Sequence, residues 1–456
     1  MTSDSPPAQP VVSPAPRGPG SSMQIRAVAS GALGNTLEYF DFAIYGALAA
    51  TLFPRLFFHD LGETGGLLAS FATFGVGFVA RPVGAVVLGH LGDRFGRKPI
   101  LFATLLLMGF SSVLIGLLPT GQGIGIAVLL VVLRCLQGFS LGGEYTGSQL
   151  VTMEHGDRSR RGLLGSVIVI GSPISQVLAN LVLVVLSASL TPAQFESWGW
   201  RIPFLGSVLI VGIAFFIRRK IDETPAFVAT THDESGRKGL RVLLTHPRQV
   251  FLLTLAWSGP NLCFYLVAVY GLSYMTARLG ISAQTAFLIL MVANGVSVVT
   301  ALLGGYTCDR IGRKPVFLAG LAGTFVGIGL FFTVAGADVV PTAIIVTVVL
   351  ASIQFLSGAV PALFAEQFPT DVRYSGAALS YTFAALLFSA PSPFIAEGLT
   401  AVGGATLVGI FALVIVLFSM IGASRLKEGR HLDLTEFALR EPAPDDEPVP
   451  GRAREL

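Results

Sequence analysis

The sequence predicts an all-α membrane protein in which twelve transmembrane helices form two pseudo-symmetric six-helix bundles. Composition is the first reason: of the 456 residues, 52% are hydrophobic and only 12% are charged, whereas soluble domains carry roughly a quarter charged residues. A repeated loop is the second reason. The stretch from Leu91 to Pro99, LGDRFGRKP, returns as TCDRIGRKP between Thr307 and Pro315. A repeat at about half the chain length indicates two similar halves.

Apolar runs of spanning length follow one another from about residue 25. The predicted spans are 27–52, 65–90, 98–118, 123–152, 162–188 and 200–217, then 248–275, 282–306, 314–335, 340–366, 374–399 and 404–424. The predicted domains are a disordered Pro-rich tail at 1–24, a bundle at 25–217, a linker at 218–247, a second bundle at 248–426 and a mostly disordered tail at 427–456. No cleavable signal peptide is expected, because no charged segment followed by a short apolar core precedes the first span.

The positions of Lys and Arg predict the orientation of the helices. If the N-terminus is cytoplasmic, the connections after the even-numbered helices are cytoplasmic too, and these hold almost all the loop Lys and Arg. The opposite connections contain only Arg55 and Arg278. Both termini are therefore predicted to be cytoplasmic.

The first span contains polar residues at helical spacing: Asn35, Glu38, Asp41 and Tyr45. Intervals of three and four place them on one face of the helix. An ionised side chain inside a span costs roughly 2.5–3.5 kcal/mol, so each is a functional candidate. Two partly desolvated carboxylates one turn apart are one way to build a proton site. The alternative is a static hydrogen-bonded pair that positions the helix.

The fourth span adds Arg134, Gln137 and Glu144. The candidate substrate contacts of the first half are Arg134, Gln137, Asn35, Tyr45 and Tyr145. Arg134 is predicted near the depth of the helix 1 carboxylates, where its guanidinium could pair with them or bind a substrate carboxylate. A permanent salt bridge is the structural alternative. Glu144 is a candidate second proton site or a counter-ion for Arg81, the buried charge of the second span. Arg81 could instead bond carbonyls freed by the Pro that follows it.

The second half is poorer in charge within its spans. Its seventh helix offers Trp257, Asn261 and Tyr265 at intervals of four, its tenth Gln354 and its eleventh Tyr381. Asn261, Tyr265 and Tyr381 are candidate substrate contacts in a polar cavity, and an interhelical hydrogen bond is the usual alternative.

The repeated loops contain candidate gating residues. Asp93 and Asp309 are expected to cap helix N-termini across each half or to pair with neighbouring arginines, holding the cytoplasmic ends together in one conformation. The predicted gating set is Asp93, Arg94 and Arg97, the matching Asp309, Arg310 and Arg313, then Glu154 with Arg158 and Arg161, and Glu366 with Arg373.

Several chemistries have no signature in the chain. There is no phosphate loop, no metal-ligand cluster and no soluble domain large enough for catalysis. An enzyme is not expected, and neither a cofactor nor a nucleic-acid partner is predicted. Transport must then use an ion gradient or the gradient of the substrate.

The repeated loops, twelve spans and central linker resemble the major facilitator superfamily. Within it, the chain resembles the metabolite:H+ symporter family, which includes permeases for shikimate, 2-oxoglutarate, citrate, and proline or betaine, and it leans towards the shikimate branch. The residues that carry this resemblance read GNTLEYFDFAIYG, GFVARPVGAVVLGHLGDRFGRKP, RCLQGFSLGGEYTGS, SWGWRIPF and IDETPAF. The aromatic at Tyr39, commonly Trp in this family, and the Tyr145 that ends the helix 4 motif are departures.

The resemblance implies a monomeric, multi-pass carrier in a bacterial inner membrane that works by rocker-switch alternating access. Our hypothesis is proton-coupled uptake of a small organic carboxylate, shikimate-like, aromatic or di/tricarboxylic, with lipid as its other partner. The family signatures fall on Glu38 and Asp41 for proton coupling and on Arg134 for the substrate.

Three rivals stay open. A zwitterion carrier for betaine or proline needs an aromatic or acidic subsite, which Tyr39, Tyr45 and Tyr145 could provide. A proton-antiport exporter of amphipathic compounds is a second rival. A sensor that no longer transports is a third, and it would need a signalling domain that this sequence does not show.

Overall fold

The computed structural model describes residues 36, 39–95, 97–121, 123–141, 160–220, 242–369 and 372–430. Throughout these residues the regular secondary structure is helical. Eight helical segments are long and apolar enough to cross a membrane: His59–Leu88, Ile124–Leu141, Arg161–Ser189, Pro247–Arg278, Ala283–Ile311, Arg313–Thr333, Val339–Ala365 and Ser375–Arg425. An all-helical membrane architecture is therefore confirmed.

The first part of the chain begins with helix at 39–51. It continues with α2 (Phe53–Phe57), η1 (His59–Leu61), α3 (Gly62–Phe95), α4 (Arg97–Leu117), α5 (Ile124–Leu141), α7 (Arg161–Val169), α8 (Gly171–Ser189), α9 (Pro192–Gln194), η3 (Phe195–Gly199) and α10 (Arg201–Lys220). Pro82 lies inside α3 without ending it. The turn at α9 starts with a capping box, in which Thr191 and Gln194 satisfy each other's backbone N–H groups.

The second part contains α13 (Pro247–Tyr265), η5 (Leu266–Tyr270), α14 (Gly271–Ser273), η6 (Tyr274–Arg278), α15 (Ala283–Ile311), α16 (Arg313–Thr333), α17 (Val339–Ser357), α18 (Val360–Ala365), α19 (Arg373–Ala384), η7 (Ala385–Ser389) and α20 (Ser392–Arg425). Gly404 interrupts α20 with a φ of 71°, a conformation that favours glycine. The interruption falls at the first residue of the predicted span 404–424.

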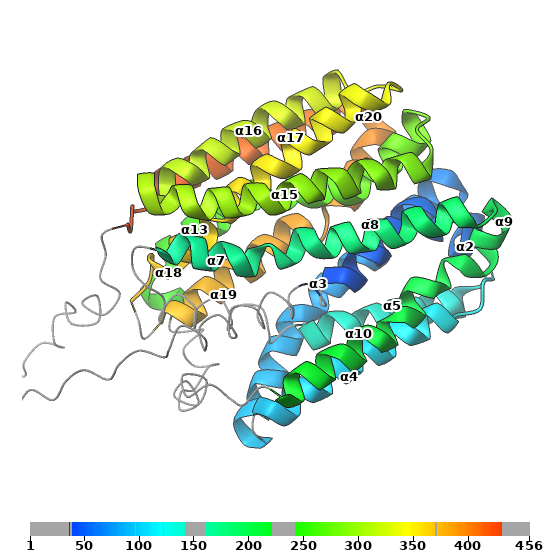
Figure 1. The fold of residues 1–456 in the computed structure, drawn as a ribbon, viewed down its shortest axis with the longest axis horizontal. Coiled ribbons are helices and arrows are strands. Elements are labelled where there is room, and N and C mark those ends of the chain that lie inside the picture. Colours follow the sequence, from blue (N-terminus) through cyan, green and yellow to red (C-terminus); the bar gives the residue numbers. More distant parts are fainter. Residues whose placement is uncertain are drawn as a thin grey trace, which may run out of the picture.

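The helices pack side by side in two groups (Figure 1). In one, α3 contacts α4 and α5, and α4 contacts α10; in the other, α15 and α16 contact α17, and α13 and α16 contact α20. Helices α7 and α8 lie along α15, and α20 reaches α3. The contacts of α15 with α7 and α8, and of α20 with α3, join segments far apart in the sequence.

Close backbone approach fixes the contact between α3 and α5. A Cβ atom added at Gly138 would lie 1.8 Å from the carbonyl oxygen of Gly77, well inside van der Waals distance. Glycine at this crossing lets the two helices touch. It also holds Arg134, one turn earlier on α5, against α3.

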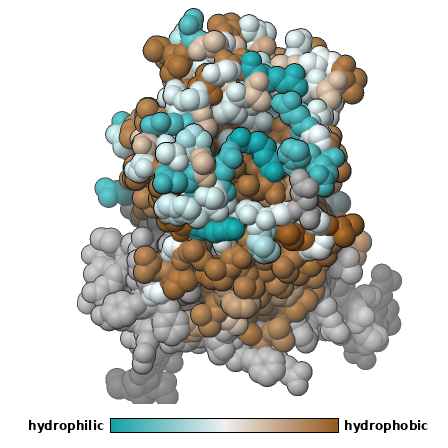
Figure 2. Space-filling view, turned by 90° about the vertical axis from the view of Figure 1, so that its right-hand side faces the viewer, coloured by the Kyte–Doolittle hydropathy of each residue, from teal (hydrophilic) through white to brown (hydrophobic). Residues whose placement is uncertain are grey.

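Apolar side chains cover much of the outer surface. Val86 and Leu209 are 71% and 72% exposed, which suits contact with lipid rather than with water. Figure 2 shows hydrophilic residues over the upper and middle part of one end of the molecule, with a broad apolar area below them. The fold therefore presents an apolar flank and a polar end.

Candidate functional site

Asp41, on the helix at 39–51, is buried and only 5% exposed. Ser112 on α4 donates a hydrogen bond to its Oδ2, and Ser207 on α10 donates to its Oδ1 over 2.7 Å. No cation lies within ion-pair distance of Asp41 in the described part of the chain. Two hydroxyl groups from two other helices thus compensate the buried carboxylate.

Arg134 on α5 is completely buried. Its Nη1 donates to Oε1 of Gln137 over 2.9 Å, and its Nη2 to the carbonyl oxygen of Phe74 over 3.4 Å. The guanidinium also lies 4.3 Å from the ring centroid of Phe42 and 3.9 Å from that of Tyr45. Aromatic faces and neutral acceptors therefore stabilise this cation.

Gln137 and Ser112 connect Arg134 to Asp41. Gln137 donates its Nε2 to Ser112 Oγ over 2.7 Å and accepts from Arg134 at its other end. The sequence prediction placed Arg134 close enough to Asp41 to pair with it. The structure brings the two residues into one hydrogen-bond network, but two neutral side chains lie between them. Arg134 and Asp41 therefore do not form the ion pair that was considered from the sequence.

Arg81 on α3 lies beside the same aromatic ring as Arg134. Its guanidinium is 4.4 Å from the centroid of Phe42 and 4.5 Å from that of Phe78. Two cations therefore share Phe42. Arg81 also packs against Phe78, and Arg134 against Phe74. The two guanidinium groups therefore lie against one layer of aromatic rings.

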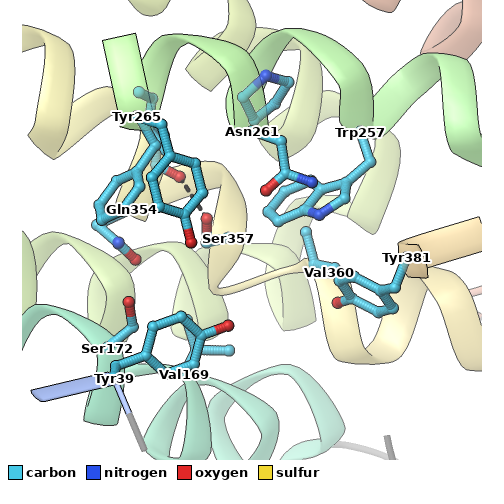
Figure 3. Close-up of a pocket in the computed structure, with 13 residues that line it drawn as sticks. Tyr39, Val169, Ser172, Trp257, Asn261, Tyr265, Gln354, Ser357, Val360 and Tyr381 are labelled. Carbon is cyan, nitrogen blue, oxygen red and sulfur yellow. Dashed lines mark hydrogen bonds between the residues drawn. The ribbon is translucent and has the colours of Figure 1, made fainter. Parts of the chain in front are cut away.

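A cavity lies next to this layer (Figure 3). Its lining comes from the helix at 39–51, α7, α8, α13, α17, α18 and α19, and consists of Tyr39, Val169, Ser172, Trp257, Pro260, Asn261, Phe264, Tyr265, Ile353, Gln354, Ser357, Val360 and Tyr381. None of these lining residues is charged. The cavity is thus neutral, aromatic and polar, with contributions from both helix groups.

The predicted substrate contacts divide between the cavity and the buried network. Asn261, Tyr265 and Tyr381 line the cavity. Arg134, Gln137 and Tyr45 do not; each is completely buried, and Tyr45 hydrogen-bonds Thr73 over 2.7 Å.

Tyr265 lies between the cavity and the two arginines. Its ring packs 5.8 Å from Phe74 and 5.2 Å from Phe78, centroid to centroid. Figure 3 shows its hydroxyl directed into the cavity. Tyr265 therefore connects the cavity lining to the aromatic rings against which Arg81 and Arg134 pack.

Asp309, at the end of α15, caps the N-terminus of α7. Its Oδ1 accepts from the N–H of Gly162 over 2.8 Å and its Oδ2 from that of Leu163 over 2.9 Å. The capping contact predicted for Asp309 is confirmed. It joins the two helix groups and uses the positive end of a helix dipole.

Arg313 forms the centre of a buried charge cluster. Its guanidinium lies 3.1 Å from Glu366 and 3.4 Å from Asp309. The sequence predicted Arg373 as the partner of Glu366, and the ion pair described for Glu366 is with Arg313 instead. The side chains of Arg313 and Glu366 are each about 1% exposed, because α16 and α18 enclose them.

The segment after α20 reaches the same cluster. Glu428 accepts hydrogen bonds of 2.9 Å from the backbone N–H groups of Arg313 and Lys314, capping α16. Gln367 exchanges hydrogen bonds with the backbone of Lys427. Sequence analysis assigned Lys427 and Glu428 to a mostly disordered tail and did not identify Glu428 as a capping residue.

Other gating candidates are described in part. Arg161 and Arg373 are buried, and Arg310 lies over the ring of Tyr306. Several predicted residues lie outside the described residues: Asn35, Glu38, Glu144, Tyr145, Glu154 and Arg158, together with the side chains of Asp93, Arg94 and Arg97.

Sequence reasoning missed three residues besides Glu428. Ser112 and Ser207 are unremarkable in an apolar helix, and only their three-dimensional position beside Asp41 shows their importance. Glu397 on α20 is a carboxylate only 5% exposed. The rule that selected Asp41, a charge within an apolar run, would also have found Glu397.

Comparison with known proteins agrees with this architecture. A model of the Major Facilitator Superfamily matches residues 31–365. The shikimate transporter of Escherichia coli (strain K12) is 33% identical over 416 residues, covering 89% of this chain and 95% of that protein. The inner membrane metabolite transport protein YhjE of the same organism is 36% identical over 412 residues, covering 88% and 94%.

Two further similarities are informative. A putative proline/betaine transporter of Staphylococcus aureus (strain COL) is 31% identical over 401 residues, covering 87% of this chain and 85% of that protein. The structure of the proton:xylose symporter XylE bound to 6-bromo-6-deoxy-D-glucose matches with a TM-score of 0.74 at 18% identity, covering 93% of this chain and 100% of that one. At this identity the structural similarity concerns the fold.

The family match and these relatives, together with the apolar helices, identify a multi-pass secondary transporter of small molecules rather than an enzyme. The chain belongs to the Major Facilitator Superfamily. Among its members it is similar to metabolite transport proteins.

Proposed function

We propose that the protein crosses the membrane twelve times as two six-helix bundles, 25–217 and 248–426, joined by a cytoplasmic linker at 218–247. Helix within each predicted span supports this count, and the Lys and Arg distribution supports cytoplasmic termini. Between the bundles, contacts of α15 with α7 and α8, and of α20 with α3, support a rocking motion.

The proposed activity is proton-coupled uptake of a small organic carboxylate. The observation that carries it is the hydrogen-bond chain from Asp41 through Ser112 and Gln137 to Arg134. Asp41 can take up or release a proton while Asp41 and Arg134 both keep hydrogen-bond partners, because neutral side chains link the buried acid to the buried cation. The similarity to a shikimate transporter and to metabolite transport proteins supports the substrate class.

In the proposed cycle, Asp41 takes a proton from the outer side and loses its charge. The network then holds Arg134 less strongly, because the carboxylate that polarised Ser112 and Gln137 is neutral. Rearrangement of Tyr265 and the phenylalanines beside it lets Arg134 meet the substrate carboxylate. Opening toward the cytoplasm releases the substrate and the proton.

Cytoplasmic gating belongs to the same proposal. Asp309 at the N-terminus of α7, and the Arg313–Glu366 pair, would hold the cytoplasmic ends together in one conformation and separate in the other. The remaining charged loop residues of the predicted set would act in the same way.

Proteoliposomes containing an internal pH dye test the coupling. Adding shikimate, protocatechuate, citrate, 2-oxoglutarate or betaine outside should acidify the lumen with at least one carboxylate. Asp41→Asn should abolish the acidification, because an amide cannot bind the coupled proton. Counterflow of a labelled carboxylate without any acidification would show an uncoupled carrier and reject proton coupling at Asp41.

A zwitterion carrier is the second candidate function. Trp257 and Tyr381, with ring centroids 5.7 Å apart, line the cavity, and aromatic faces attract quaternary ammonium groups. A relative named as a putative proline/betaine transporter supports the same possibility. Uptake of betaine, with competition by other quaternary amines and none by carboxylates, would favour this function.

A further inference from the structure

Gln354 on α17 carries a polar atom that the fold leaves without a partner. The residue is 4% exposed, and its Oε1 has no hydrogen-bond partner among the described residues. Buried polar groups in native proteins are nearly always paired, so an exception needs a physical reason. The reason here is its position: Gln354 lines the cavity.

Two other buried amides provide a comparison. Asn180 and Asn294 also have an Oδ1 without a partner in the described part of the chain. Neither lines the cavity, and each donates its Nδ2 to a carbonyl one turn earlier in its own helix, over 2.7 Å and 2.8 Å. In Figure 3 the amide of Gln354 points instead into the space between Ser172 and Tyr265. Of these three unpaired oxygens, only that of Gln354 belongs to a residue that lines the cavity, and in this conformation the oxygen itself is shielded from solvent.

The cavity lining indicates which ligand group would fill it. Gln354 and Asn261 are amides, and Ser172 carries a hydroxyl, so these groups both donate and accept hydrogen bonds. A hydroxyl group on the ligand does the same and would pair with Gln354 Oε1. A carboxylate only accepts, so it could pair with the N–H groups of the Gln354 amide but not with this oxygen. The ring faces of Trp257 and Tyr381 offer an apolar wall for the carbon skeleton.

We propose that Gln354 binds a ring hydroxyl of the substrate, so the transported compound is a hydroxylated ring carboxylate rather than a linear di- or tricarboxylate. This rests on the proposed function, because the carboxylate is expected on the Arg134 side of the cavity, beyond Tyr265. The hydroxylated end of the molecule then faces α17.

Competition measurements on the full chain in proteoliposomes test this subsite. Two hydroxylated ring acids, shikimate and protocatechuate, are compared with their counterparts lacking hydroxyls, cyclohexenecarboxylate and benzoate. Wild-type protein should prefer a hydroxylated acid over its counterpart. Gln354→Leu should lower that preference roughly ten- to a hundred-fold, since it removes the hydrogen-bonding partner. Asn294→Leu, a buried amide outside the cavity, should leave the preference unchanged.

A wild-type preference retained in folded Gln354→Leu would overturn the proposal; if that variant does not fold, Gln354→Met keeps the side-chain length and replaces it. Uptake of citrate or 2-oxoglutarate, but of no hydroxylated ring acid, would also overturn it while leaving carboxylate symport intact. Uptake of betaine alone would overturn both the subsite and the proposed function.

Discussion

Ser207 donates a hydrogen bond of 2.7 Å to Asp41 while its hydroxyl also lies 3.5 Å from the carbonyl oxygen of Pro203. Ser112 has the same choice, since the carbonyl oxygen of Met108 lies 3.0 Å from its hydroxyl. Each serine can therefore turn to its own helix when Asp41 becomes protonated and donates instead. The site accommodates both charge states of Asp41 without moving a helix.

The first prediction concerns the pH dependence of uptake. Ser112→Ala removes a donor that favours the ionised form of Asp41, so protonation should occur at higher pH. A hydrogen bond to a charged group contributes about 1.5–3 kcal/mol, and about 1.4 kcal/mol corresponds to one pH unit. The pH of half-maximal uptake should rise by about one to two units.

Ser111→Ala is the matched control for that measurement. Ser111 neighbours Ser112 but donates to the carbonyl oxygen of Leu107 over 2.7 Å, so its loss should leave the profile in place. An unchanged profile in Ser112→Ala would show that this hydroxyl does not set the protonation of Asp41.

The second prediction concerns the fork shape of Arg134. Arg134→Lys keeps the charge but cannot reach Gln137 Oε1 and the carbonyl oxygen of Phe74 together, as the guanidinium does. Initial uptake rates should fall at least tenfold while the protein stays folded. Uptake near the wild-type rate would mean that charge alone suffices at this position.

The third prediction concerns the pair Arg313 and Glu366. Breaking a buried ion pair typically costs about 3–5 kcal/mol. Removing Arg313 leaves Glu366 without its ion-pair partner, whereas removing Glu366 leaves Arg313 with Asp309 at 3.4 Å. Arg313→Met and Glu366→Leu should each lower the thermal unfolding midpoint in detergent. The double variant should lose less than the sum of the two, because both single variants break the same pair. Additive losses would show that the two side chains are not coupled.

The fourth prediction concerns the glycine contact of α3 and α5. Gly138→Ala places a methyl group 1.8 Å from the carbonyl oxygen of Gly77, so the helices must separate, and overpacking typically costs about 1–3 kcal/mol or more. The unfolding midpoint should fall. Gly295→Ala on α15, where no atom lies within 4 Å of an added Cβ, is the control. Equal midpoints for the two variants would rule out a tight crossing.

The extent to which the sequence predicted the site differs between residues. Asp41 and Arg134 were identifiable because a charge inside an apolar run is costly and therefore conspicuous. Asp309 was identifiable because its loop is repeated. Ser112 and Ser207 were not, since a neutral polar residue in a membrane helix is common and its importance depends on what faces it.

Pairing was the hardest feature to predict. Glu366 was expected to contact Arg373, a neighbour along the chain, yet its ion pair in the structure is with Arg313. Arg134 was considered as a partner of Asp41, yet Gln137 and Ser112 lie between them. Sequence spacing places residues on a helix face but does not specify the rotation of that helix against its neighbours.

The helices, the apolar surface and the residues whose burial requires compensation could be predicted from the amino-acid sequence. Hydropathy is a property of short segments, so local composition suffices to predict these features. The groups that provide the compensation, and the neutral cavity next to the aromatic rings that cover the buried cations, became visible in the three-dimensional structure. Those features depend on close packing between segments distant in the chain, where contacts such as Gly138 with Gly77 set the depth and rotation of each helix.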